Sequence, residues 1–193
     1  MNAEGCTIIE TSFLGEGIDY TGLELRSHFI RQRTRIASDG LIAFVGRCEV
    51  DGARLVDLED AAAGSVIRAR KMLHFIGEHF QCPLREGNAR LRLFAAVVKE
   101  AIEEMAPGTP AGRRGDDLFV NGRKLTVAIC TVSPVSTLFH FGVNVDPLGA
   151  PVPAVGLAEL GIETAPFALS VLERYRLECE SIELALRKVR GVP

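Results

Sequence analysis

An Asn-Gly dipeptide, Asn121-Gly122, lies between two short apolar segments and constrains the fold more than any other feature of the sequence. The flanking segments are 117–120 (DLFV) and 124–131 (KLTVAICT), and β-branched residues are frequent in both. Asn-Gly favours a two-residue turn with positive φ at both positions, which joins the strands of a tight β-hairpin. We therefore predict that Phe119 pairs with the strand that begins at Lys124. We expect a third strand, 137–145, in the same sheet.

The remaining predicted elements are grouped by type rather than strictly alternating. We expect strands at 6–14 and 40–50, a short helix at 23–33 and longer helices at 68–80 and 88–105. A final helix that starts near Thr164 carries an apolar stripe with the 3.6-residue period of an α-helix, formed by Ala168, Val171, Leu172, Tyr175, Cys179, Ile182 and Leu186. This grouping predicts an α+β fold, a mostly antiparallel sheet with packed helices, in a single domain that spans 1–193.

Composition excludes several classes of protein. Hydrophobic residues make up 47% of the 193 residues and charged residues 24%, which excludes a disordered or fibrous chain. No apolar run reaches the roughly 18 residues of a membrane span, and no basic cluster precedes an apolar stretch at the start. We therefore expect a cytoplasmic protein without a membrane partner. The net charge of −3 argues against nucleic acid as a partner.

The five cysteines are scattered and never spaced as Cys-x-x-Cys. This pattern predicts reduced thiols that are mostly buried, with no metal among them.

The segment 112–145 concentrates the residues that could carry chemistry. Asp116 and Asp117 open one predicted strand, Lys124 opens the next, and Gly142 and Asn144 end the third. If the three strands are neighbours, two carboxylates, an ammonium and an amide lie close together beside a glycine. An ammonium that enters a buried strand needs an anion. That anion is either one of the two aspartates or a phosphate or carboxylate of a substrate, and the residues alone leave both alternatives open.

Other candidate residues lie outside this segment. The run 26–35 (RSHFIRQRTR) carries four arginines and no acid, and Arg33 and Arg35 are candidates for binding an anion at the edge of the site. The alternative is that this run forms a solvent-exposed face of a helix and binds no ligand. His140, in an apolar strand, is either a hydrogen-bonded core histidine or a donor to the pocket beside Asn144. His74 and His79 are five residues apart on a predicted helix, which is not the spacing of a metal pair.

Three pieces of this segment, taken in order, resemble the core of biotin protein ligases and lipoate ligases. They are 117–119 (DLF), 121–125 (NGRKL) and 142–145 (GVNV). The whole chain also resembles an uncharacterised family, domain of unknown function 366. That resemblance is carried by 56–60 (VDLED), 72–76 (MLHFI), 115–118 (GDDL) and 131–136 (TVSPVS). The resemblance implies a biotin/lipoate ligase-like fold for the whole chain.

The same resemblance implies a function. It implies a small-molecule-binding protein whose ligand bears a carboxylate or phosphate, and an acyl- or nucleotidyl-transfer enzyme if the protein is catalytic. Lys124 and Asp117 would then be catalytic, with Asp116, Asn144, Gly142, Arg33, Arg35 and His140 binding the substrate. ATP with magnesium enters only through the resemblance. The alternative is a non-catalytic binding or regulatory module that kept the pocket, and a homodimer also stays open.

Where the biotin ligases have a glycine pair after the lysine, this chain has Thr126 and Val127. Ser136 stands where the octanoyltransferase relatives have a cysteine. The resemblance therefore supports the scaffold and Lys124 rather than biotin, lipoate or octanoyl chemistry.

Overall fold

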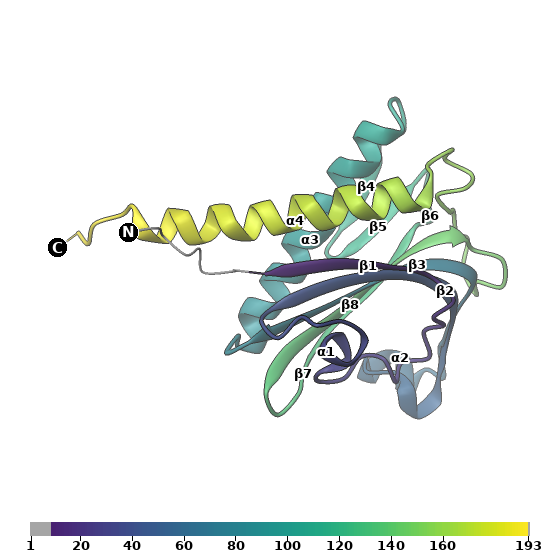
Figure 1. The fold of residues 1–193 in the computed structure, drawn as a ribbon. Helices are drawn as coiled ribbons and strands as arrows, with labels where there is room; N and C mark the ends of the chain where they lie inside the picture. Colours follow the sequence, from purple (N-terminus) through teal and green to yellow (C-terminus); the bar gives the residue numbers. More distant parts are fainter. Residues whose placement is uncertain (1–8, 193) are drawn as a thin grey trace.

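The computed structural model describes residues 9–192 and shows a five-stranded sheet, a three-stranded sheet and four α-helices in this part of the chain (Figure 1). The strands are β1 (Glu10–Glu16), β2 (Gly40–Asp51), β3 (Val66–Phe80), β4 (Ala111–Arg114), β5 (Asp117–Val120), β6 (Arg123–Lys124), β7 (Thr126–Val132) and β8 (Ser136–Asp146). The helices are α1 (Phe29–Arg33), α2 (Leu58–Ala62), α3 (Leu84–Met105) and α4 (Thr164–Arg187), and a 3₁₀ turn covers Gly52–Arg54.

The large sheet has the strand order β1-β2-β3-β8-β7. The outer strand β1 is parallel to β2. The other neighbouring pairs of this sheet, β2–β3, β3–β8 and β8–β7, are antiparallel. The small sheet has the order β4-β5-β6 and is antiparallel throughout. The predicted α+β fold with a mostly antiparallel sheet is therefore confirmed.

The predicted helix at 68–80 is wrong, because this segment forms the central strand β3. The sheet is covered on both faces here, so Met72, Leu73, Phe75 and Ile76 are all buried. A strand that is buried on both faces is a continuous apolar run, which periodicity does not separate from a buried helix. As a result His74 and His79 point to opposite faces of the sheet.

The predicted hairpin is confirmed in its turn and in its pairing. Asn121 and Gly122 have φ values of 50° and 74°, and Phe119 pairs with Lys124. The expected common sheet is wrong, however, because the returning strand is interrupted at Leu125. Its first part, β6, belongs to the small sheet, and its second part, β7, pairs with β8 in the large sheet.

The other elements differ from expectation mainly in their boundaries. Only Phe29–Arg33 of the expected helix 23–33 is helical, whereas α3 starts four residues earlier than expected. The first strand begins at Glu10 and extends to Glu16, and residues 6–8 of the expected strand lie outside the described residues.

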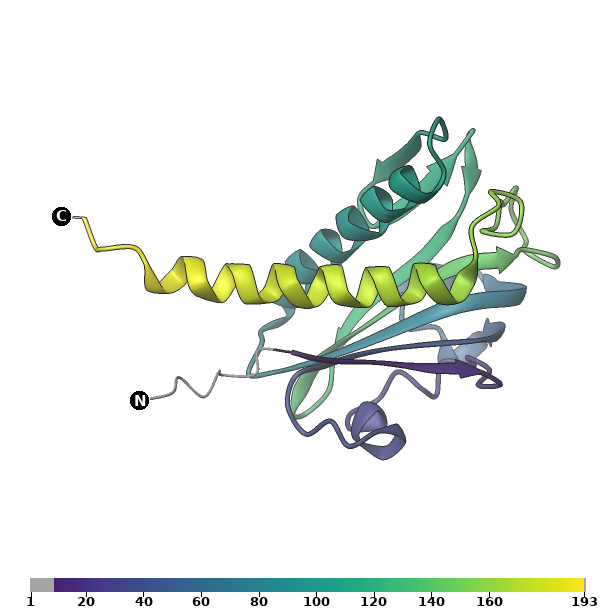
Figure 2. The ribbon, with the colours of Figure 1, turned by 45° about the horizontal axis from the view of Figure 1, so that its top comes forward.

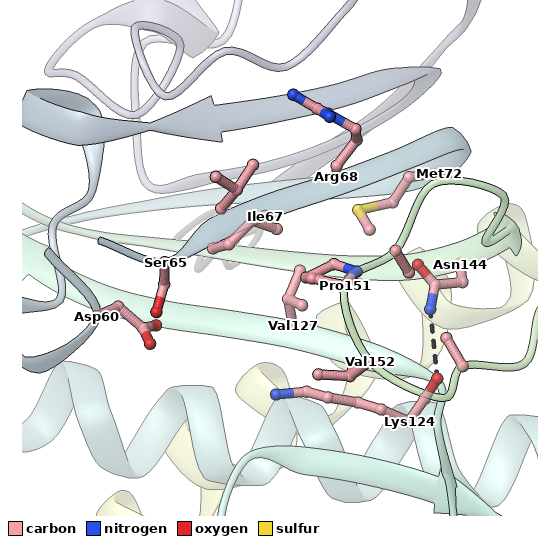
Figure 3. A pocket seen from close by; sticks show the side chains of 13 residues that line it. Asp60, Ser65, Ile67, Arg68, Met72, Lys124, Val127, Asn144, Pro151 and Val152 are labelled. Carbon is pink, nitrogen blue, oxygen red and sulfur yellow. Dashed lines mark hydrogen bonds between the residues drawn. The ribbon is translucent and has the colours of Figure 1, made fainter. Parts of the chain in front are cut away.

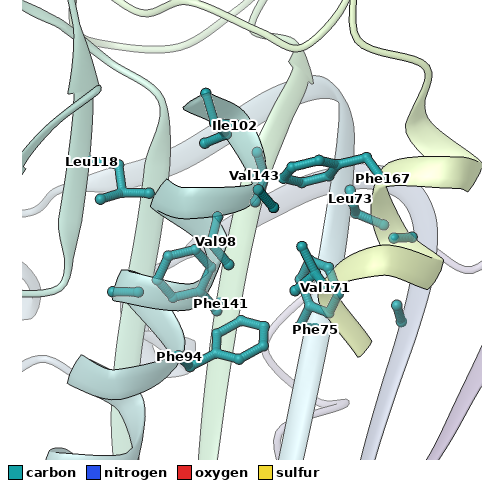
Figure 4. Close-up of a cluster of buried hydrophobic side chains, with 14 of the residues drawn as sticks. Leu73, Phe75, Phe94, Val98, Ile102, Leu118, Phe141, Val143, Phe167 and Val171 are labelled. Atoms are coloured by element: carbon teal, nitrogen blue, oxygen red, sulfur yellow. The ribbon is translucent and has the colours of Figure 1, made fainter. Parts of the chain in front are cut away.

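Long helices cover one face of the large sheet, and short elements cover the other (Figure 1). Figure 4 shows part of the larger core, where Phe94 and Val98 of α3 and Phe167 and Val171 of α4 meet Phe75, Phe141 and their neighbours on the sheet. The opposite face carries α1 and the loop that contains Tyr20 over a smaller apolar cluster, and α2 lies on the same side of the sheet (Figure 1). On β8, Phe139, Phe141 and Val143 belong to the larger core, so the alternation of the strand turns His140, Gly142 and Asn144 to the opposite face.

Four cysteines lie within the described residues, and all four are free thiols. Cys48 and Cys179 are buried, as expected, whereas Cys82 and Cys130 are only partly buried. Cys6 lies outside the described residues. Among residues 9–192, no helix has the length and apolar character needed to cross a membrane.

Candidate functional site

Leu125 joins the two sheets and thereby fixes the position of Lys124. Its backbone N–H donates to the carbonyl of Leu118 in the small sheet, and its own carbonyl accepts from the N–H of Asn144 in the large sheet, both at 2.9 Å. The Leu125 side chain is fully buried. Lys124 is therefore held at the junction of the two sheets, beside Asn144.

The loop that follows β8 closes over this junction. The Lys124 N–H donates to Pro153 O at 2.9 Å, and the Lys124 carbonyl accepts from the N–H of Val155 at 3.1 Å. The side-chain amide of Asn144 donates to the same carbonyl at 3.3 Å, which Figure 3 shows as a dashed line. These bonds attach the proline-rich loop to the backbone of Lys124.

A cavity of about 170 Å³ opens between this loop, the start of β3 and the strands β7 and β8 (Figure 3). Lys124 and Asn144 form part of its wall. Most of the remaining lining is apolar, and it comprises Val66, Ile67, Met72, Val127, Ala150, Pro151, Val152 and Ala154. Asp60, Ser65 and Arg68 supply the other polar groups.

Lys124 and Asp117 form an ion pair across the β5–β6 hairpin. The distance from Nζ to Oδ2 is 2.9 Å, and the two side chains retain 30% and 32% of their exposure. The ammonium is thus accompanied by a carboxylate and still reaches solvent. Of the two alternatives that the sequence leaves open, an internal anion for Lys124 is present, and the lysine also borders a cavity.

The charges at the cavity are nearly balanced, and Lys124, which is shared with Asp117 at 2.9 Å, is the cation that lies beside Asn144. Lys124 and Arg68 are cations of the lining, and Asp60 is its carboxylate. Arg68 is paired with Glu49 at 2.9 Å. An ammonium, an amide and apolar walls together suit an amphipathic molecule with one carboxylate or phosphate.

A second cavity of about 60 Å³ adjoins the first and shares Asp60, Ile67 and Val127 with it. His140 and Tyr20 line this second cavity rather than the one beside Lys124. Their rings are stacked with centroids 3.7 Å apart. The position of His140 differs from its expected place beside Asn144, because the two residues are four positions apart on one strand.

His140 is hydrogen-bonded to His74, with 3.1 Å between Nε2 of His140 and Nδ1 of His74. Burial lowers the pKa of His74 to about 3, and burial followed by the neighbouring His74 lowers the pKa of His140 well below its usual range. Both imidazoles are therefore neutral at pH 7. The pair presents an uncharged polar group to the second cavity.

The remaining predicted site residues, Asp116, Gly142, Arg33 and Arg35, are not among the residues that line the cavity. Asp116 pairs with Arg92, with 3.5 Å between the carboxylate and the guanidinium. Gly142 lies under Met72 and Val127, where a Cβ would collide with the sulfur of Met72. Arg33 and Arg35 do not line the cavity.

The basic run lies near the opposite end of β3. The carboxylate of Glu78 accepts the N–H of His28 at 3.0 Å, and this bond holds the start of α1. Met72, at the cavity, lies six residues before Glu78, or about 20 Å along a strand. Arg33 stacks on Phe29 with its Cζ 5.4 Å from the ring centroid, and Arg35 is exposed.

Sequence reasoning missed Asp60, Arg68, Met72 and the loop 150–154 as parts of the cavity. Met72 and Arg68 lie in the segment for which the periodicity predicts a helix, and a helix would not place them on the sheet. The signal that could have indicated the loop is the spacing of Pro147, Pro151 and Pro153 directly after Asn144, which is typical of a rigid connection.

Comparison with solved structures identifies the class of fold. A biotin protein ligase from Aquifex aeolicus in complex with biotin and ATP superposes with a TM-score of 0.58 at 17% identity, over 89% of this chain and 71% of that chain. Protein Ta0514 of T. acidophilum with bound lipoic acid gives a TM-score of 0.53 at 13% identity, over 74% and 73% of the two chains. The fold is that of the biotin/lipoate protein ligases.

Nearer relatives identify the family. The DUF366 family, a domain of unknown function, matches residues 9–190, and the chain belongs to this family. It is 32% identical to the uncharacterised protein MJ0805 of Methanocaldococcus jannaschii over 91% of this chain and 82% of that one. A protein of unknown function from Pyrococcus horikoshi superposes with a TM-score of 0.90 at 37% identity, over 96% of this chain and all of the other.

Proposed function

We propose that this protein binds a small amphipathic molecule through one carboxylate or phosphate, which Lys124 meets in the cavity at the sheet junction. The observation that carries the proposal is the ammonium of Lys124 beside the amide of Asn144 in an otherwise mainly apolar lining. The Lys124–Asp117 pair is only partly buried, so a ligand anion can compete for the ammonium without leaving a fully buried carboxylate unpaired.

The solved neighbours support a carboxylic acid as the ligand. Biotin and lipoic acid, named with two of them, each combine one carboxylate with an apolar chain. In this chain the side chains of Val127 and Met72 line the cavity and fill the space beside Gly142. We infer a ligand with a slimmer body than biotin, such as a simple acyl chain.

If the protein is catalytic, we propose that it is an acyl- or nucleotidyl-transfer enzyme. ATP, named with the Aquifex structure, would supply an activated phosphate, and Lys124 and Arg68 are the cations of the lining that its phosphates would meet. Lys124 would then stabilise negative charge that develops on the reacting oxygens. The alternative is a binding module that holds the same ligand without transfer.

Thermal unfolding of the wild type and of Lys124→Ala with octanoate, lipoate, biotin, AMP and ATP tests the binding proposal. We expect a ligand-induced rise in Tm that Lys124→Ala lacks. Arg123→Ala is the matched control, because Arg123 is the preceding residue of the hairpin, pairs with Glu159 and does not line the cavity. Equal shifts in all three proteins, or no shift with any compound, would count against the proposal.

Exchange of labelled pyrophosphate into ATP separates the enzyme from the module. Exchange that depends on the added acid and is lost in Lys124→Ala supports transfer of AMP to that acid. Binding of the acid without exchange supports the module.

A further inference from the structure

The second cavity lies along the same face of the large sheet as the cavity beside Lys124. On β8, Asn144 borders the first cavity and His140 borders the second. Val127 of β7, which lies opposite Gly142 in the register, borders both. The four positions from Asn144 to His140 correspond to about 13 Å along a strand. An extended ligand of that length reaches both cavities when it follows this face of the sheet.

The segment between β1 and β2 supplies one wall of the second cavity. Figures 1 and 2 show this segment on the side of the large sheet away from α3 and α4. Two backbone bonds fix Tyr20 against β2, because its N–H donates to the carbonyl of Arg47 at 2.9 Å and its carbonyl accepts from the N–H of Glu49 at 3.0 Å. These bonds hold the ring of Tyr20 on the ring of His140.

Two polar atoms of this cavity have no hydrogen-bond partner. Tyr20 is only 4% exposed and His140 only 3%. His140 uses its Nε2 for the bond to His74, and within residues 9–192 neither its Nδ1 nor the Tyr20 hydroxyl forms a hydrogen bond. Both atoms stay accessible, unlike Nε2 of His74, which is enclosed without a partner. Buried polar groups are nearly always hydrogen-bonded, so these two atoms indicate a polar group that enters the cavity.

The two atoms suit an uncharged hydroxyl group. Nδ1 of His140 is a donor or an acceptor, depending on which ring carries the proton shared with His74. A hydroxyl both donates and accepts, and the phenol of Tyr20 does the same, so a ligand hydroxyl can bond to both atoms in either tautomer. The cavity volume of about 60 Å³ is that of roughly two water molecules, which leaves no room for a ring system.

A charged group fits this position less well. Both imidazoles are neutral, so a charge placed between Tyr20 and His140 would lose its hydration without gaining a counter-ion. The cavity lining has charged residues only where it is exposed or half-buried, and they are Arg54, Asp57 and Asp60.

We propose that the ligand is a medium-chain acid with a hydroxyl at its far end, held by its carboxylate at Lys124 and by its hydroxyl between Tyr20 and His140. This inference rests on the proposed function, because it extends the same ligand from the first cavity into the second. Val127 and Ile67, which line both cavities, contact the chain between the two polar ends (Figure 3). The second cavity thereby selects the hydroxyl and the length of the chain.

Titration calorimetry of the wild type with ω-hydroxydecanoate and undecanoate tests the proposal, because undecanoate has a methyl group in place of the hydroxyl. We expect the hydroxy acid to bind at least about tenfold more tightly, since the methyl group leaves two buried polar atoms without a partner. The shorter ω-hydroxyhexanoate does not span both cavities and should have no such advantage over heptanoate. Equal affinities for ω-hydroxydecanoate and undecanoate would overturn the inference.

Tyr20→Phe removes the hydroxyl and keeps the ring. This variant should lose most of the preference for ω-hydroxydecanoate, bind undecanoate as the wild type does and keep its Tm, because the hydroxyl bonds to no described residue. Tyr175→Phe is the matched control, since Tyr175 is the other tyrosine of the chain and its hydroxyl bonds to Nε2 of His79 at 3.2 Å in the larger core. Tyr175→Phe should lower the Tm and keep the preference. A preference that survives Tyr20→Phe would contradict the proposed place of the hydroxyl.

Lys124→Ala separates this inference from the proposed function. It should weaken ω-hydroxydecanoate and undecanoate by the same factor, because the two acids share the carboxylate. If both acids depend on Lys124 but bind equally well to the wild type, the proposed function stands and this inference fails. If the wild type binds neither acid, both fail. Tighter binding of decanedioate or ω-aminodecanoate than of ω-hydroxydecanoate would show that the second cavity takes a charged group, which would also overturn the inference.

Discussion

The side-chain amide of Asn144 donates a hydrogen bond to the backbone carbonyl of Lys124, 20 residues away, at 3.3 Å. This bond lies where the two sheets meet, and it ties the end of β8 to the residue whose ammonium borders the cavity. Because the same carbonyl also accepts from Val155, one peptide group holds the strand and the loop that closes the cavity. The candidate site is therefore part of the structural junction of the molecule.

Replacing Lys124 with alanine should cost little stability. Its pair with Asp117 is about one-third exposed, and solvent-screened pairs contribute about 0–1 kcal/mol, compared with about 3–5 kcal/mol for breaking a buried pair. Urea unfolding should give a loss of about 1 kcal/mol or less. Leu125→Ala, at the fully buried neighbour, should lose about 2–5 kcal/mol. A larger loss for Lys124→Ala than for Leu125→Ala would contradict this account.

Asn144→Ala should destabilise the protein by about 1–2 kcal/mol, because it removes a hydrogen bond to a backbone carbonyl at the sheet junction. The loop that begins at Pro147 should also become more accessible to hydrogen exchange, since the Asn144 side chain holds the Lys124 carbonyl, which also accepts from the loop N–H of Val155 at 3.1 Å. Chemical denaturation and amide exchange measure the two effects. Unchanged exchange at residues 153–157 would show that the loop is held without Asn144.

Gly46→Ala should be strongly destabilising, by about 2–3 kcal/mol. A Cβ at this position would collide with the backbone carbonyl of Ile18, which belongs to the loop that carries Tyr20 onto His140. Gly112→Ala is the control, because the nearest atom to its added Cβ is the Phe119 carbonyl oxygen at 3.8 Å. Thermal unfolding of both variants checks the prediction, and equal melting temperatures would refute it.

Stability should fall as the pH is lowered below about 6.5, the ordinary pKa of histidine in an unfolded chain. Burial holds the folded pKa of His74 near 3 and that of His140 well below its usual range, so between these values only the unfolded chain binds the protons. The contribution of the two neutral histidines to folding stability is complete above pH 6.5. As the pH falls below 6.5, each histidine removes about 1.4 kcal/mol of stability per pH unit.

Urea unfolding between pH 4.5 and 7.5 measures this slope. His140→Phe removes one of the two groups and should reduce the slope by about the contribution of one histidine, whatever its effect on absolute stability. Tyr20, stacked on both rings, does not titrate in this range because burial raises its pKa. Parallel pH profiles for the wild type and the variant would contradict the assignment.

Local chemistry along the sequence determined the hairpin, the two helices α3 and α4, and the place of Lys124 beside the turn. Asn121-Gly122 specifies its turn without help from the rest of the chain, because the two positive φ values suit these residue types. The position of Lys124 two residues after this turn follows directly, as does its pairing opposite Phe119. The resemblance of the three motifs then gave the fold class.

Tertiary structure decided the features that depend on burial and on contacts between distant segments. Residues 72–79 of β3 are buried on both faces of the sheet, which no local period reveals. Leu125 divides the returning strand between two sheets because its carbonyl meets Asn144, a contact over 19 positions. Arg33 and Arg35 are separated from Lys124 because Glu78 holds the start of α1 at the other end of β3. The sequence by itself named Lys124 and Asn144, and the packing of the sheet determined that they share a cavity with Asp60 and Arg68.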